Sequence, residues 1–225
     1  MLKSIYDEMW ADALEKINRN ELDLDPLIDD PNDFRRGITL QAGPEKKTLV
    51  DFSRFLTEAQ NIEPKQYFYL PDEIHITVLS IINCKTGFNL SEISLPDYIG
   101  YIEESIKNIK PFTIEFKGIT TSPSCILVQG FPNNNSLDLI RDNLRNKFGA
   151  GSLNNSIDAR YRIKTAHCTV IRFRKKLKEK QNFIELLKNY RNYYFGKTCI
   201  NHLELVQTDW YHKNDLVQVL HEFEL

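Results

Sequence analysis

Hydrophobic and polar positions along this 225-residue chain alternate in ways that predict a mixture of helices and strands. Leu49, Phe52, Leu56 and Ala59 recur every three or four positions, which indicates one face of an amphipathic helix. Runs rich in β-branched residues, without glycine or proline, indicate strands. We expect helices at about 4–17, 45–60, 98–109, 136–148 and 177–191, and extended segments at about 37–42, 67–70, 74–82, 112–119, 125–130, 163–173, 203–208 and 216–225.

The first 33 residues form a separate segment in this pattern. The helix at 4–17 has an apolar stripe that includes Met9 and Trp10, and we expect this stripe to dock on the body of the protein. The acidic stretch 21–33 contains two prolines and is predicted to be an irregular connector. A calcium loop is disfavoured there, because the central glycine and the closing glutamate of an EF-hand are missing. We therefore predict an N-terminal helix and connector over 1–33 and one domain over 34–225.

The composition, 41% hydrophobic and 27% charged, is typical of an ordinary soluble globular protein. A formal net charge of −2 argues against binding to long duplex nucleic acid, because such binding depends on many Lys and Arg contacts to phosphates. No segment has the apolar length of a membrane span, and the N-terminus lacks the apolar stretch of a signal peptide. Four scattered cysteines without a CxxC pair favour a reducing compartment. We expect a cytoplasmic monomer that binds no membrane.

Two short strings in the chain match each other, His-Ile-Thr-Val at 75–78 and His-Cys-Thr-Val at 167–170. Each lies in a predicted strand, where side chains alternate between faces, so the histidine and the threonine of each string share a face. Two histidines can divide acid and base roles near neutral pH, and two threonines can donate hydrogen bonds to anionic oxygens. The pair therefore suits chemistry at a phosphate.

A similar stretch of chain precedes each string. Ile-Thr-Leu-Gln-Ala-Gly-Pro at 38–44 resembles Ile-Leu-Val-Gln-Gly-Phe-Pro at 126–132, and each is followed by a predicted helix and then by its histidine string. This order predicts a duplicated strand–helix–strand unit. Two similar lobes would then face each other across a pseudo-twofold axis, with both histidines in a central cleft.

Other interpretations of the two strings are weaker. One His-x-Thr string alone is most simply a strand with a semi-polar face, because three-residue patterns arise often by chance, but its repetition in matching contexts favours a functional pair. A zinc site usually has a third protein ligand, and apart from Glu73 no Cys, Asp or Glu lies at a recognisable spacing. A serine-hydrolase triad is disfavoured because the chain has no Gly-x-Ser-x-Gly. We predict no metal and no cofactor.

Paired His-x-Thr-hydrophobic strings about ninety residues apart resemble the signature of the two-histidine phosphoesterase superfamily, which includes 2′-5′ RNA ligases and 2′,3′-cyclic phosphodiesterases. The stretch 203–225 also resembles the final hairpin of that family. The resemblance implies a bilobal α+β fold, with two antiparallel sheets lining a central cleft and helices on the outside. It also implies that His75 and His167 are the acid/base pair and that Thr77 and Thr169 hold the non-bridging phosphate oxygens.

We therefore predict a metal-independent phosphodiesterase that cleaves 2′,3′-cyclic phosphates or 2′,5′-phosphodiester bonds of an RNA terminus or a small nucleotide. Formation of a 2′,5′ bond is the reverse of its cleavage, so ligation stays open, as does the question of which histidine is the acid. A non-catalytic nucleotide- or RNA-binding module is a different class of function. An interaction role for the N-terminal helix around Trp10 is a third.

Four further residues are candidates for substrate binding. Arg160 precedes the second string, and arginine is the usual partner of phosphate oxygens. Tyr69 precedes the first string, while Trp210 and Tyr211 lie in the loop of the final hairpin, and their rings could stack on a base.

The remaining basic and histidine side chains near the strings are given no role in the site. If the second strand keeps its alternation, Arg162, Lys164 and Arg172 lie on the face opposite His167, and we expect them to be solvated there. The other histidines have no partner motif, so we expect no catalysis from His202, His212 and His221.

Overall fold

The computed structural model describes residues 2–225 and contains all five predicted helices. They are α1 (Leu2–Arg19), α2 (Lys46–Ile62), α3 (Leu95–Ile106), α4 (Ser136–Ala150) and α5 (Lys180–Asn189). The strands are β1 (Arg36–Ala42), β2 (Tyr67–Phe68), β3 (Ile76–Lys85), β4 (Phe112–Thr121), β5 (Cys125–Pro132), β6 (Cys168–Arg172), β7 (Tyr194–Ile200), β8 (His202–Thr208) and β9 (Gln218–Glu224). Short 3-10 turns lie at Pro71–Glu73, Leu90–Glu92 and Asn214–Leu216.

The strand β7 is not predicted by the pattern, because Gly196 interrupts its apolar alternation. Gly196 has a φ of 107° and sits where the register between β4 and β7 shifts, so the glycine belongs to a bulge inside a real strand. A second difference is that the strand predicted at 163–173 is shorter in the structure, because regular pairing in β6 begins at Cys168. Each histidine of the two strings therefore lies one residue before its strand.

The strands of residues 2–225 form one curled antiparallel sheet in the order β7-β4-β5-β6-β3-β1-β8-β9, with β2 paired to β6. Outward from the centre, one half runs β6, β5, β4, β7 and the other runs β3, β1, β8, β9. The two central strands pair at one position within the described chain, Ile76 with Cys168. The predicted bilobal α+β fold is confirmed, with its two sheets joined edge to edge at this pair.

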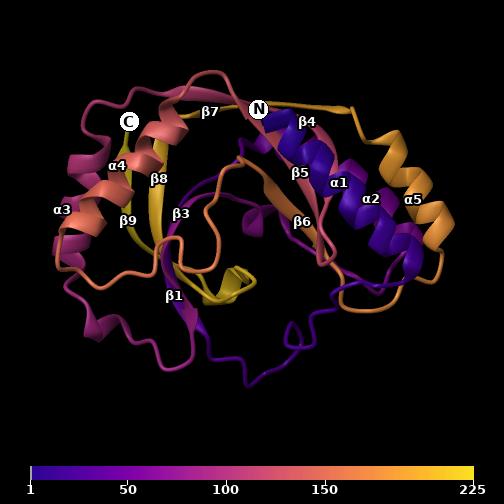
Figure 1. Cartoon of the computed structure of the whole chain (residues 1–225), viewed down its shortest axis with the longest axis horizontal. Coiled ribbons are helices and arrows are strands. Elements are labelled where there is room, and N and C mark those ends of the chain that lie inside the picture. Colours follow the sequence, from indigo (N-terminus) through magenta and orange to yellow (C-terminus); the bar gives the residue numbers. More distant parts are fainter. Residues whose placement is uncertain (1) are drawn as a thin grey trace.

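The helices cover the outside of the two halves in a crossed arrangement. α2 connects β1 to β3 but packs against β7 and α5 of the other half, and α4 connects β5 to β6 but packs against β3 and α3. Figure 1 shows α1, α2 and α5 together on one side and α3 with α4 on the opposite side. The two connections thus occupy corresponding places in the two halves, and the duplication of the strand–helix–strand unit stays a prediction.

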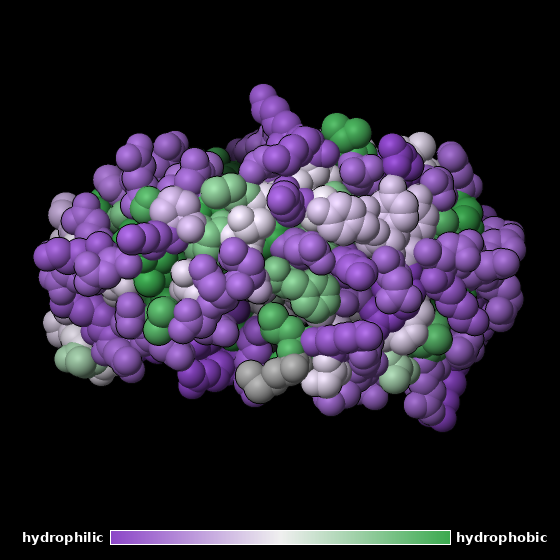
Figure 2. Space-filling model, turned by 90° about the horizontal axis from the view of Figure 1, so that it is seen from above, coloured by the Kyte–Doolittle hydropathy of each residue, from purple (hydrophilic) through white to green (hydrophobic). Residues whose placement is uncertain are grey.

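Hydrophobic side chains fill the space between the sheet and these helices. Phe52 of α2 meets the rings of Phe116 and Phe195 edge-on, with centroids 5.3 and 5.4 Å apart. On the face seen in Figure 2, hydrophilic residues predominate and hydrophobic ones form small separate patches. None of the helices within residues 2–225 is both long and apolar enough to cross a membrane.

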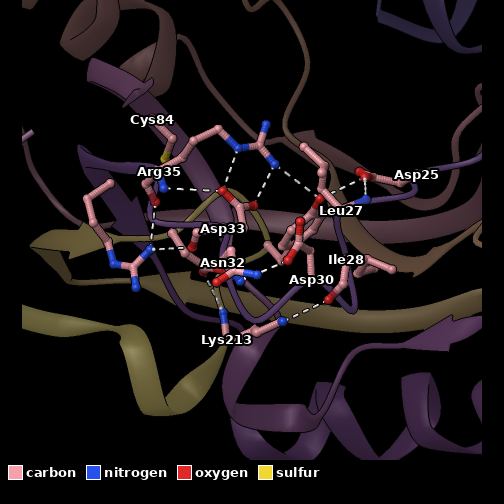
Figure 3. Close-up of polar contacts among 12 residues, drawn as sticks. Asp25, Leu27, Ile28, Asp30, Asn32, Asp33, Arg35, Cys84 and Lys213 are labelled. Carbon is pink, nitrogen blue, oxygen red and sulfur yellow. Dashed lines mark hydrogen bonds and ion pairs between the residues drawn. The ribbon is translucent and has the colours of Figure 1, made fainter. Parts of the chain in front are cut away.

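The acidic connector is irregular, as predicted, and is tied to the body by polar contacts (Figure 3). Asp33 accepts two bonds from the guanidinium of Arg35, of 2.8 and 2.7 Å, which lowers the pKa of that carboxyl. Lys213 donates to the carbonyl oxygen of Ile28 at 2.8 Å, and the hydroxyl of Tyr211 donates to Asp25 at 2.7 Å. The connector is thereby fastened to the loop between β8 and β9.

A test of the close approach between β5 and the segment before β6 comes from Gly130. A Cβ atom at this position would lie 1.8 Å from the carbonyl oxygen of Ala166, so we expect Gly130→Ala to lower the unfolding free energy by about 3 kcal/mol. Gly149→Ala is the matched control, because nothing lies within 4 Å of its added Cβ and alanine favours the helix by up to about 1 kcal/mol. Urea denaturation measures both, and a Gly130→Ala variant as stable as the parent would contradict the packing.

Candidate active site

The pairing of Ile76 with Cys168 determines how the two histidine strings meet. In an antiparallel pair, the residues on either side of this position are also opposite each other, so His75 faces Thr169 and Thr77 faces His167. All four side chains share one face, since they flank the paired residues by one position. The two imidazoles are diagonal neighbours, at a Cα separation of about 7–8 Å. Two histidines and two threonines thus surround one point at the centre of the sheet.

Both strands have a bulge at the same place after the threonine. On β3, Val78 is the extra residue, because Leu79 pairs with Leu40 while Thr77 pairs with the next residue of β1. On β6, Val170 is the extra residue in the same way. Each bulge shifts the alternation by one, so the residue three after the threonine returns to the face of the histidine. The two bulges therefore occupy corresponding positions in β3 and β6.

Because of the bulge at Val170, Arg172 does not lie on the face that the sequence pattern predicts. Strict alternation puts Arg172 on the face opposite His167, but after the extra residue Val170 its side chain lines the same cleft as the histidine. Its counterpart on β3 is Ser80, which also lines the cleft. Arg172 is held there by a 2.7 Å bond from its Nε to the hydroxyl of Tyr69. The site consequently has a half-buried cation that the sequence pattern assigned to solvent.

The cleft has a volume of about 180 Å³ and brings all the predicted site residues together. Its lining includes His75, Thr77, His167, Thr169, Tyr69, Arg160, Trp210 and Tyr211. The roles of these residues in catalysis and binding stay predictions. Arg162 and Lys164 do not line this cleft and are exposed, as expected of them.

The four predicted binding residues differ in their accessibility. Tyr69 and Tyr211 are nearly fully buried, and the hydroxyl of Tyr211 is engaged by Asp25. Arg160 is exposed, and its guanidinium lies 4.0 Å from the centre of the Trp210 ring. The two tyrosines are therefore walls of the cleft, whereas Arg160 and Trp210 form its accessible rim.

Each histidine is held through Nδ1 by a group two residues earlier in the chain. Nδ1 of His75 donates to the carbonyl oxygen of Glu73 at 2.9 Å. Because a carbonyl can only accept, this contact fixes the hydrogen on Nδ1 and leaves Nε2 to exchange a proton. Nδ1 of His167 lies 2.7 Å from the hydroxyl oxygen of Thr165, which can donate or accept. Both imidazoles are thus oriented through Nδ1, but the partner is a carbonyl oxygen for His75 and a hydroxyl oxygen for His167.

Burial controls the protonation of both rings. Desolvation lowers the pKa of His75, while its bond to the carbonyl of Glu73 acts in the opposite direction. Desolvation lowers the pKa of His167 to about 4, and the positive charge of Arg141 adds to the effect. With their pKa values lowered, both rings are neutral at pH 7. A bound phosphate would favour their protonated forms, because a nearby negative charge raises the pKa of a histidine.

Arg141 of α4 connects β3 to the segment that leads into β6 and is not suggested by the motifs. Its side chain is 1% exposed, and Nε donates to the carbonyl oxygen of Val78 at 2.8 Å. Nη2 donates to the carbonyl oxygens of Thr77 at 3.0 Å and of Thr165 at 2.8 Å. Burial lowers the pKa of Arg141 to about 10, so it remains charged at neutral pH. One sequence signal exists, since this arginine interrupts the apolar stripe of its helix.

His212 also lies in the cleft, which the sequence does not predict. Its ring centroid is 3.9 Å from that of His75, and the planes are tilted by 35°. Nδ1 of His212 lies 3.1 Å from the hydroxyl oxygen of Thr208. The φ of His212 is 61°, a left-handed conformation that is uncommon outside glycine and often marks functional positions. By contrast, His202 and His221 do not line the cleft.

Within residues 2–225, the structure gathers no group of three or more His, Cys, Asp or Glu side chains that could hold a metal ion. The chemistry available in the cleft includes the imidazoles of His75 and His167, the hydroxyls of Thr77 and Thr169 and the guanidinium of Arg172. This set can transfer protons and stabilise negative charge on oxygen.

Residues 37–225 match a family model described as the AKAP7 2'5' RNA ligase-like domain. No curated protein is similar enough in sequence to be counted as a relative. The family match begins at the second residue of β1 and thus excludes α1 and the connector.

Solved structures share the fold at low sequence identity. The protein TT0787 of Thermus thermophilus superposes with a TM-score of 0.60 at 15% identity, covering 84% of this chain and 97% of the other. LigT of E. coli gives 0.56 at 8% identity, covering 85% and 98%. A conserved protein of unknown function from Agrobacterium tumefaciens, ATU0111, gives 0.53 at 14% identity, covering 94% and 97%. At these identities the likeness concerns the fold alone.

The link between the two histidine strands can be tested at Arg141. Arg141→Met would leave three backbone carbonyls, two in β3 and one before β6, without this donor, so we expect the unfolding free energy to fall by about 3 kcal/mol or more. Lys147→Met is the control, because Lys147 lies on the same helix as Arg141. It removes only a partly exposed ion pair with Glu104 of α3 and should lower the unfolding free energy by about 1 kcal/mol at most. Urea denaturation distinguishes them, and similar losses for both variants would show that Arg141 is no essential link.

The buried His212 predicts a pH dependence of stability. Desolvation, with a smaller effect of His75, lowers the pKa of His212 to about 2, whereas the unfolded chain binds a proton below about pH 6.5. Its contribution to the unfolding free energy is therefore complete above pH 6.5 and is lost progressively as the pH falls toward 2. For one group this loss is about 2 kcal/mol between pH 6.5 and 5.

The variant His212→Asn isolates this effect, because asparagine tolerates the left-handed conformation and does not titrate. Urea denaturation at pH 6.5 and pH 5 should show that the parent loses about 2 kcal/mol more than the variant. If both proteins lose the same amount, His212 is not a buried neutral imidazole.

Proposed function

Because this chain belongs to the AKAP7 2'5' RNA ligase-like domain family, within the two-histidine phosphoesterase superfamily, we propose that it is a metal-independent phosphodiesterase. Its substrates would be 2′,3′-cyclic phosphates or 2′,5′-phosphodiester bonds of RNA ends or small nucleotides. The observation that carries this proposal is the pairing of Ile76 with Cys168, which sets two histidines and two threonines around one point of the cleft. That point is where the scissile phosphate would lie.

In the proposed reaction, His167 is the general base and His75 the general acid. Nε2 of His167 takes a proton from the attacking water as its oxygen bonds to phosphorus. The bond from phosphorus to the leaving oxygen breaks, and His75, protonated in the presence of the bound phosphate, donates its Nε2 proton to that oxygen. The assignment follows from the surroundings, since the carbonyl of Glu73 favours a protonated His75, whereas the cation of Arg141 disfavours a protonated His167.

The negative charge that develops at phosphorus needs donors in the cleft. The hydroxyls of Thr77 and Thr169, one from each lobe, line the cleft and would donate to the non-bridging oxygens. Arg172 adds a positive charge, and it is oriented by its bond to Tyr69. Positioning and electrostatic stabilisation are the main requirements of phosphoryl transfer, and these residues supply both.

Two alternatives concern the same cleft. Ligation would use the same groups in reverse, with His75 taking a proton from the attacking hydroxyl. A nucleotide-binding module would need the donors but no acid/base pair, so two oriented imidazoles favour an enzyme. LigT of E. coli has been crystallised with ATP, with 3'-AMP and with NADP+, which supports a nucleotide as the ligand of this cleft.

The test is the incubation of purified protein with chelator against 2′,3′-cyclic nucleotides and 2′,5′- and 3′,5′-linked dinucleotides. We expect cleavage with a bell-shaped pH dependence, as two titrating groups require. His75→Ala and His167→Ala should each lower kcat/KM by about a hundredfold or more. His221→Ala, outside the cleft, is the control and should retain the parental rate. Full activity in either cleft variant would refute the acid/base pair, and loss of activity with chelator would refute metal independence.

A further inference from the structure

The helix α1 lies outside the family match, yet one of its side chains reaches the backbone beside His167. Tyr6 is 0% exposed, and its hydroxyl donates to the carbonyl oxygen of Gly130 at 3.1 Å. The same oxygen accepts from the N–H groups of Gly130 at 3.3 Å and of Ala166 at 3.2 Å. The phenol bridges β5 and the approach to β6 just where their regular pairing ends. α1 is thus fixed relative to the histidine that follows Ala166.

A second, larger pocket lies between α1 and the segment 160–165. Its volume is about 450 Å³, and it shares His167, Thr169, Arg172 and Trp210 with the lining of the histidine cleft. The two spaces therefore meet beside the second histidine. Of the two, only the larger falls in the range of about 300–1,000 Å³ that is usual for ligand pockets.

The lining of this second pocket combines apolar and basic side chains. Ile5 and Met9 of α1 and Leu127 of β5 form apolar walls, to which the turn between β4 and β5 adds the hydroxyls of two serines, Ser122 and Ser124. Besides Arg172, which also lines the histidine cleft, the basic residues are Arg160, Arg162 and Lys164. A flat ring with polar edges, attached to a phosphate, matches such a lining.

The three cations differ in their availability to a ligand. Arg162 is paired with Asp142 at 2.9 Å, and Arg160 lies on the ring of Trp210. Lys164 is exposed and forms no ion pair within residues 2–225. It is therefore the cation most readily engaged by an incoming phosphate.

The connector fixes the other parts of this pocket. The N–H of Asp23 donates to the carbonyl oxygen of Pro123 at 3.0 Å, within the turn between β4 and β5. The N–H of Asp25 donates to the carbonyl oxygen of Phe173, next to Arg172, at 3.0 Å. At the far end of the connector, the guanidinium of Arg35 lies 5.4 Å from the centre of the Trp210 ring. The N-terminal segment thus contacts the pocket's surroundings at several points.

We propose that this second pocket binds a further nucleotide of the substrate, next to the scissile phosphate, and that α1 is one of its walls. The inference rests on the proposed phosphodiesterase function and narrows its substrates, favouring chains of at least two nucleotides over cyclic mononucleotides. It also gives the N-terminal segment a part in substrate binding.

The variant Met9→Trp tests the proposal, because an indole would fill the pocket from the α1 side. The kcat/KM for a 2′,5′-linked dinucleotide, divided by that for a 2′,3′-cyclic mononucleotide, should fall at least tenfold. Ala11→Trp is the matched control on the same helix, since Ala11 is exposed and does not line the pocket, and it should leave this ratio unchanged. An unchanged ratio in Met9→Trp would overturn the proposal.

Lys164→Gln provides a second variant that does not disturb the helix. It should raise KM for a 2′,5′-linked dinucleotide that carries a terminal phosphate several-fold with little effect on kcat, and an unchanged KM would argue against a phosphate near this lysine. If the parent cleaves neither substrate, the proposed function fails, and the pocket is judged by calorimetric binding of the dinucleotide. Weaker binding to Met9→Trp than to Ala11→Trp would then support the pocket, and equal binding would overturn it.

Discussion

The guanidinium of Arg141 is the interaction on which the geometry of the cleft depends. The two halves of the sheet meet at the pair of Ile76 with Cys168, and beyond it their strands separate to open the site. Arg141 spans this junction from α4 and donates to carbonyl oxygens on both sides. A buried charge is tolerated only when it is well hydrogen-bonded, so the cation stays where those carbonyls are. It thereby fixes the distance between the two histidine strings.

The two halves of the sheet have similar backbones at the site but present different side chains to the cleft. The bulges after Thr77 and Thr169 occupy the same place in each strand, yet they present Ser80 on one side and Arg172 on the other. The first histidine is held by a backbone carbonyl and the second by a hydroxyl. A symmetric backbone with asymmetric side chains is what a reaction needs when one group must give a proton and the other must take it.

Local patterns predicted the helices, most strands and the two strings, because period and motif are properties of short stretches of chain. What they could not predict depends on contacts between distant segments. Arg172 changes face because of a bulge in its pairing with β5, and β7 contains a glycine that breaks its alternation. Arg141 and His212 enter the site through tertiary packing. Of these, only Arg141 leaves a trace in the sequence, as a charge on an apolar stripe.

The strand order also has a consequence for folding. β1 pairs with β8 and β4 pairs with β7, so neither half of the sheet is complete until residues near position 200 are in place. The hydroxyl of Tyr6 likewise meets Ala166, which lies 160 residues further along the chain. Such non-local contacts slow folding, because long loops must close before the contacts can stabilise them. α1 is synthesised first but can dock only after the strands near the C-terminus have been made. During that interval its apolar face is exposed, and folding requires that the chain does not aggregate.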